Sequence, residues 1–151
     1  MRKVLLDANL IVLLIVGNVG RERIEKHKRL SAYRAEDWDL LIDVLSDYEQ
    51  IVVTPNVLTE ASNLMRSGDK SSRDAFSVIM QTLMSDAAEE YVESKSVVAD
   101  DRFARLGLAD VASLGAMDAH TTLLTADLGL FLAALNQGNR ATNFNHLRDQ
   151  A

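Results

Sequence analysis

The stretch VLLDANLIVLLIV, at residues 4–16, predicts a short buried strand followed directly by a helix. A β-compatible apolar run ends at Asp7, and a different periodicity follows. Asp7 and Asn9 interrupt the run, so it falls short of the roughly 18 apolar residues that a membrane helix needs. No small-residue cleavage pattern follows it, which argues against a signal peptide. We therefore expect a cytoplasmic chain without a membrane segment.

The composition of the chain predicts one globular domain over residues 1–151. Of these 151 residues, 48% are apolar and 25% are charged, a balance that allows one sizeable core. The absence of cysteine excludes disulfides and cysteine-based zinc sites. A net charge of −6 argues against a protein that coats nucleic acid non-specifically, since phosphate affinity comes from clustered Lys and Arg.

Strands and helical stretches alternate outward from the first strand. Further strands are predicted at residues 51–53, 121–125 and 141–144. Helices are predicted at about residues 9–16, 36–48, 55–67, 71–94, 96–107, 109–117 and 127–135. Strands separated by helices need crossover connections, which predicts a parallel sheet. The expected fold is three-layer α/β/α with a central, mostly parallel sheet of four or five strands.

Four acidic residues are expected to meet at one edge of this sheet. Asp7 and Asp127 each follow a predicted strand, so both lie at the carboxyl edge, where ligand sites form in parallel sheets. Asp110 opens a helix that runs back antiparallel to the strands, so its first turn begins near that edge. Glu60 lies at the border of an apolar helical stripe, from which it can lean over the edge.

Such a group of carboxylates favours a bound cation. Carboxylates in a low-dielectric pocket repel one another and have raised pKa values unless a cation neutralises them. Hard oxygen ligands suit Mg²⁺ or Mn²⁺. Each Asp could instead act only as a helix cap, and Glu60 could lie on a solvated helix face. The convergence of four acids from distant segments favours the metal site over independent caps.

Four segments resemble the motifs of the PIN-domain family, especially the small bacterial toxin ribonucleases known as VapC. They are VLLDANLIV at 4–12, VTPNVLTEASNL at 53–64, LGLADVASLGAM at 106–117 and LLTADLGLF at 123–131. ATNFNHLR at 141–148 resembles the family's terminal strand. The resemblance implies that Asp7, Glu60, Asp110 and Asp127 are the metal-binding catalytic acids and that Asn9 and Thr125 support them.

This resemblance implies an endoribonuclease that uses Mg²⁺ or Mn²⁺ to hydrolyse RNA phosphodiester bonds. Asp7, Asp110 and Asp127 would hold the principal metal, and Glu60 with Asp110 would hold a second metal or position the water. A toxin of this type would have an antitoxin protein as partner and would form a homodimer.

Two other classes of function stay open. One is a non-catalytic module of the same fold that binds RNA or a protein. The other is an aspartyl-phosphate enzyme, although its usual Lys after a late strand is missing after Thr125.

One basic segment, RERIEKHKRLSAYR at residues 21–34, lies where the chain is longer than a typical VapC toxin. Its cations are candidates for holding an RNA backbone; they are Arg21, Arg23, Lys26, Lys28, Arg29 and Arg34. A solvated amphipathic helix is the alternative. The three histidines of the chain occupy unrelated places, so we expect them to be surface or packing residues.

Overall fold

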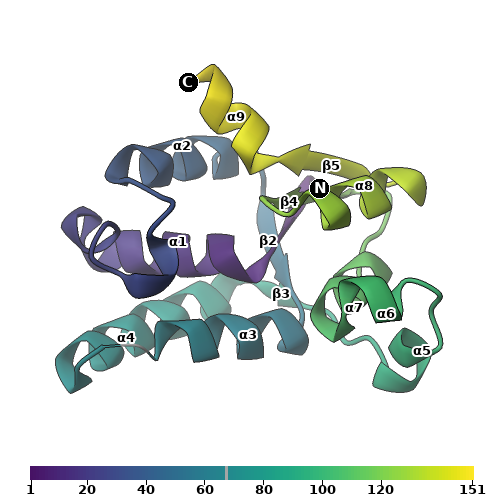
Figure 1. Cartoon of the computed structure of the whole chain (residues 1–151), viewed down its shortest axis with the longest axis horizontal. Coiled ribbons are helices and arrows are strands. Elements are labelled where there is room, and N and C mark those ends of the chain that lie inside the picture. The colour runs from purple at the N-terminus through teal and green to yellow at the C-terminus, as the bar shows by residue number, and fades with distance from the viewer. Residues whose placement is uncertain (67) are drawn as a thin grey trace.

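The computed structural model describes residues 1–66 and 68–151, which contain a five-stranded sheet whose strands all run parallel (Figure 1). The strands are β1 (Lys3–Leu6), β2 (Gln50–Val53), β3 (Ala88–Glu89), β4 (Thr121–Thr125) and β5 (Arg140–Asn143). Their order across the sheet is β3-β2-β1-β4-β5. The first strand of the chain therefore lies in the middle of the sheet, paired with β2 and β4.

Helices cover both faces of this sheet. They are α1 (Ala8–Val19), α2 (Ala35–Leu45), α3 (Pro55–Met65), α4 (Lys70–Asp86), α5 (Ser94–Val98), α6 (Phe103–Leu106), α7 (Leu108–Gly115), α8 (Leu128–Asn136) and α9 (Phe144–Gln150). On one face of the sheet, Leu5 of β1 packs in a cluster with Leu114 of α7 and Leu130 of α8. Val4 and Leu6 belong to a second cluster with α1. The predicted three-layer α/β/α fold is confirmed.

Helix α1 is the centre of the larger core. Its residues from Leu10 to Val16 are buried, because α2, α3 and α4 pack around it (Figure 1). The prediction that this helix ends near residue 16, before Gly17, is wrong, since it continues to Val19. A Cβ on Gly17 would lie 2.1 Å from Cδ1 of Trp38. The missing side chain thus lets the indole of α2 close against α1.

The predicted helix at 71–94 is too long. It ends at Asp86, and Ala88–Glu89 form the short strand β3 instead. These two residues pair with the end of β2, and the N–H of Glu90 donates to the carbonyl of Val53 at 2.9 Å. The residues after Asp86 therefore pair with the edge of the sheet and do not continue α4.

The predicted helix at 96–107 is two short helices, α5 and α6. Asp100 lies between them and accepts hydrogen bonds from both the backbone and the guanidinium of Arg102. This local turn competes with continuous helix. The predicted helix end at 67 falls on a residue outside the described ranges, and α3 itself ends at Met65.

The last strand, predicted at residues 141–144, lies at the edge of the sheet and ends at Asn143. Phe144 begins α9, a helix that the sequence reading missed. Asn143 caps this helix, because its Oδ1 accepts the N–H of Asn145 at 2.9 Å.

The basic segment does not form the amphipathic helix that was one of its two interpretations. It contains two 3-10 helices, η1 (Arg21–Arg23) and η2 (Lys28–Leu30). Every third residue is buried, namely Ile24, His27, Leu30 and Tyr33. The charged residues between them face outward. Over residues 1–66 and 68–151, no helix has the length and apolarity needed to cross a membrane.

Candidate functional site

A pocket of about 1000 Å³ opens at the carboxyl edge of the sheet. It is lined by the loops after β1 and β4, by residues of α3, α7 and α9, and by part of the basic segment. All four predicted acids line it: Asp7, Glu60, Asp110 and Asp127. Asn9 lines it as well. The structure thus brings together the acids that the sequence places at this edge, and their role as metal ligands stays a prediction.

Asp7 is held in place from two sides. Its Oδ1 accepts the backbone N–H of Asn9 at 3.0 Å, which caps α1. Its Oδ2 accepts a hydrogen bond from the hydroxyl of Thr125. Thr125 is fully buried at the end of β4, and its Oγ1 also accepts the N–H of Asp127 at 3.0 Å. Thr125 therefore links the two acidic loops.

Capping explains only half of the acidic group. Asp127 caps α8, since its Oδ1 accepts the N–H of Leu130 at 2.9 Å, and Asp7 caps α1. Asp110 lies inside the first turn of α7, and Glu60 lies in the middle of α3. In the part of the chain that the structure describes, neither of these two side chains makes a hydrogen bond or an ion pair. Capping therefore does not account for Asp110 or Glu60. Asp110 still lies in the first turn of α7, where a negative charge stabilises the helix dipole. Glu60 is exposed on α3, as the solvated-face interpretation expects.

Burial and the charges of neighbouring acids raise the pKa values of Asp7, Glu60 and Asp110. Burial raises the pKa of Asp110 to about 7, and the charges of Asp127, Asp7 and Glu60 add to it. Burial also raises the pKa of Asp7, against the hydrogen bonds from Thr125 and Asn9 that lower it. The pKa of Glu60 is raised by burial and by Asp7. None of these causes is a neighbouring cation.

Lys and Arg side chains pair with other acids instead. Ion pairs among the described residues involve Asp37, Asp39, Asp74, Asp100 and Asp118. None involves a pocket acid. The pocket acids are therefore not directly paired with any cation of the described residues.

Ser113 is a pocket residue that the sequence reading missed. It lines the pocket one helical turn after Asp110, and it is only 1% exposed. Its Oγ is buried and has no hydrogen-bond partner in the described ranges. An unpartnered buried hydroxyl costs about 1–3 kcal/mol, so it points to an oxygen supplied from outside the chain. The signal in the sequence is the i, i+3 spacing from Asp110, which puts both residues on one helix face.

The donor set suits a hard cation, but its present arrangement is not a finished metal site. The pocket acids offer only carboxylate oxygens, the chemistry that Mg²⁺ and Mn²⁺ prefer. As they stand, no three His, Cys, Asp or Glu side chains of the described residues are arranged to hold a metal ion. Asp110 and Glu60, which have no hydrogen bonds to break, are the side chains free to rotate toward Asp7 and Asp127.

The structure separates the six cations of the basic segment. Arg29 lines the acidic pocket. Arg21 pairs with Asp39 at 2.6 Å, and Nη1 of Arg23 donates to the hydroxyl of Ser72 at 2.9 Å. Lys26, Lys28 and Arg34 are exposed and do not line this pocket. Only one of the six predicted RNA-binding cations therefore reaches the acids' pocket.

Comparison with known proteins adds no function. No protein-family model matches this chain, and no curated protein matches it. Among solved structures, the chain is similar to a domain of a functionally unknown protein from Methanocaldococcus jannaschii DSM 2661. The two are 14% identical with a TM-score of 0.49, and the match covers 95% of this chain and 91% of the other. This chain is a parallel α/β domain with an acid-lined pocket at the carboxyl edge of its sheet.

Proposed function

We propose that this chain is a metal-dependent endoribonuclease, of the PIN type that its four motifs resemble, which hydrolyses RNA phosphodiester bonds with Mg²⁺ or Mn²⁺. One observation carries the proposal. Carboxylates from four separate elements line one pocket, and no Lys or Arg of the described residues pairs with any of them.

The electrostatics of the pocket support a bound cation. Carboxylates that repel one another and have raised pKa values are stabilised when a cation binds between them, because the cation favours the charged form of each. The pKa of Asp110, raised to about 7, is the clearest example. The unpartnered hydroxyl of Ser113 in the same pocket gives independent support for a ligand with oxygen atoms or bound water.

Each pocket residue has a defined role in the proposed metal site. Asp7, Asp110 and Asp127 would hold the principal metal, and Glu60 with Asp110 would hold a second metal or orient the attacking water. Thr125 keeps the Oδ2 of Asp7 fixed, and the N–H of Asn9 keeps its Oδ1 fixed. A divalent cation bound there would lower the pKa of its water and neutralise the leaving oxygen. No covalent nucleophile from the protein is required.

The test is cleavage of total RNA with Mg²⁺, with EDTA as the control. We expect cleavage with Mg²⁺, none with EDTA, and a loss of about a hundredfold or more in Asp110→Asn, which keeps the shape of the side chain but removes its charge. Asp101→Asn is the matched control, because Asp101 is exposed and does not line the pocket. Full metal-dependent activity in Asp110→Asn, or no cleavage by the wild-type chain, would contradict the proposal.

A non-catalytic binding module is the second candidate, and one observation favours it. No ready-made set of three metal ligands exists within residues 1–66 and 68–151. Calorimetric titration with Mn²⁺ distinguishes the two functions. Binding that Asp7→Asn abolishes supports the nuclease, whereas no binding supports the module. An antitoxin protein partner, a homodimer and a cytoplasmic location are further proposals that depend on the resemblance to VapC toxins.

A further inference from the structure

Two arginines line the acidic pocket, and only one of them is free to bind a ligand. Arg148 on α9 is fully engaged: its guanidinium donates to Asp37, to Asn145 and to the carbonyl of Ala32. It also lies over the ring of Tyr33 at 4.8 Å. The side chain of Arg29, by contrast, is exposed and makes no hydrogen bond or ion pair with a described residue.

The backbone that carries Arg29 is firmly placed. The N–H of Arg29 donates to Nδ1 of His27 at 3.2 Å, which caps η2. His27 and Leu30 are buried on either side of it, and the imidazole packs edge-on against Phe76 at 6.1 Å. Burial, and then the charge of Arg29, lower the pKa of His27, which favours the neutral imidazole whose Nδ1 can accept a hydrogen bond. A hydrogen-bonded turn thus presents the exposed guanidinium of Arg29 at the pocket.

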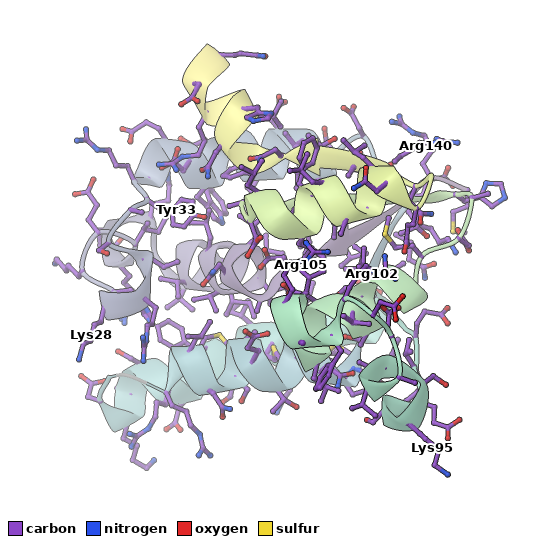
Figure 2. All side chains as sticks on the ribbon, turned by 45° about the vertical axis from the view of Figure 1, so that its right-hand side comes forward. Lys28, Tyr33, Lys95, Arg102, Arg105 and Arg140 are labelled. Atoms are coloured by element: carbon purple, nitrogen blue, oxygen red, sulfur yellow. The ribbon has the colours of Figure 1, made fainter. Side chains whose placement is uncertain are left out.

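A second free arginine lies where α6 meets the pocket. Arg105 is exposed and forms no ion pair in the described ranges, and the next residues, Leu106 and Gly107, line the pocket. Figure 2 shows Arg105 extending from α6 toward α8. Its neighbour Arg102 is not available, because it pairs with Asp100 at 2.8 Å and donates to Gln137. Arg29 and Arg105 come from two separate elements, η2 and α6, and each element contributes a residue to the pocket lining, Arg29 and Leu106.

Neutral amides line the pocket together with the acids. Those without a side-chain hydrogen bond to a described residue are Asn9, Asn56 and Asn63. Asn145 also lines the pocket, but its side chain donates to the carbonyl of Ala126 and accepts from Arg148. Amide side chains can both donate to phosphate and sugar oxygens and pair with the edges of unstacked bases. A pocket rich in carboxylates repels a polyanion, so substrate phosphates need cations beside the acids. The two free arginines and the amides meet these needs.

We propose that a single RNA strand crosses this pocket, with one backbone phosphate held by Arg29 on η2 and another by Arg105 on α6. This inference rests on the proposed nuclease function, because it places the bond to be cut over the acids between the two arginines. A flexible single strand can follow a concave surface and turn its bases toward the amides, whereas a stiff A-form duplex cannot.

Binding of a fluorescent single-stranded RNA tests the inference. It is measured with Mg²⁺ in an Asp110→Asn background, which prevents cleavage, over a series of salt concentrations. Arg29→Gln and Arg105→Gln should each weaken binding about threefold to tenfold and flatten the slope of log K against log salt by about 0.7. Lys95→Gln is the charge-matched control, because Lys95 is exposed on α5 and points away from the pocket region (Figure 2). Its slope should equal that of the background protein.

Each result has a defined meaning. Unchanged affinity and slope in both arginine variants would overturn the inference, even if the wild-type chain cleaves RNA and the nuclease function stands. Weakened binding in both variants of a chain that never cleaves would support this surface and contradict the nuclease. If the same RNA annealed to its complement binds as tightly and with the same dependence on Arg29, the single-strand assignment is wrong.

Discussion

The four pocket acids form two pairs that differ in how firmly their side chains are held. Asp7 and Asp127 follow strands, cap helices and are linked through Thr125. Asp110 and Glu60 lie on helices and have no hydrogen bond or ion pair to the described chain. The sheet therefore fixes one pair, which we call the strand pair, and leaves the other, the helix pair, positioned only by its helices.

This difference explains how the acids can share a pocket without forming a ready-made ligand set. The strand pair cannot move without losing hydrogen bonds, whereas the helix pair can turn away from it to reduce repulsion. A cation bound by the strand pair would replace this repulsion between carboxylates with attraction, and would draw the side chains of the helix pair toward it. The loops after the strands therefore hold their acids in fixed positions, whereas the helices carry acids whose side chains can adjust.

The largest loss of metal affinity and activity should come from removing the hydrogen bonds that hold the strand pair. Thr125→Val removes the donor to Asp7 and the acceptor for the N–H of Asp127, in a fully buried place. We expect Mn²⁺ affinity, measured by calorimetry, and kcat/KM for RNA cleavage to fall about 10–100-fold, as is usual when a group that orients a metal ligand is lost. The pKa of Asp7 should rise, because the Thr125 hydrogen bond lowers it.

Thr125→Ser is the matched control, since it keeps the hydroxyl and loses one methyl group. Near wild-type Mn²⁺ affinity in the Ser variant, with loss in the Val variant, would assign the effect to the hydrogen bonds. Equal losses in both variants would mean that packing of the methyl group, and not the link between the acidic loops, holds the strand pair.

The strand pair was also the part of the site that the sequence predicts best. A polar residue directly after a buried apolar run has a defined place in a parallel sheet, so Asp7 and Asp127 were located by local pattern alone. Asp110 and Glu60 followed less directly, from where their helices must begin. Ser113 needed the structure, because the lack of a partner is a property of the surroundings and not of the residue. Arg29 was among the six cations named from the sequence, but only the structure distinguishes it from the others as a pocket residue.

The same distinction applies to the fold. The long apolar run of β1 and α1 predicts its own structure, whereas β3 has only two residues and exists because β2 offers it an edge. The basic segment was interpreted from its charged residues alone. The pattern of a buried residue at every third position from Ile24 to Tyr33 was missed. That period is the signature of 3-10 geometry, in which residues three apart lie on one face.

A moderate effect is expected from the charge of the helix pair. In the metal-free protein, folded Asp110 loses its proton near pH 7, whereas the unfolded residue loses it near pH 4. Between these values the unfolded state binds fewer protons, so raising the pH favours unfolding. Thermal unfolding in EDTA should show that the wild-type chain loses about 1–2 kcal/mol relative to Asp110→Asn from pH 4 to pH 7, a figure reduced for solvent screening. Equal pH profiles would mean that the pKa of Asp110 is near its ordinary value.

The smallest effect should come from Ser113, which lies beside the helix pair and belongs to neither pair. Ser113→Ala removes a buried hydroxyl that has no partner in the described chain, so the metal-free protein should become more stable by about 0.5–1 kcal/mol. With Mn²⁺ present this gain should shrink, because the hydroxyl then has an oxygen to bond. Ser62→Ala, an exposed position on α3, corrects for the helix propensity of alanine and should show no metal dependence. The same stability gain with and without Mn²⁺ would make Ser113 a packing residue and remove the independent support that it gives to the pocket.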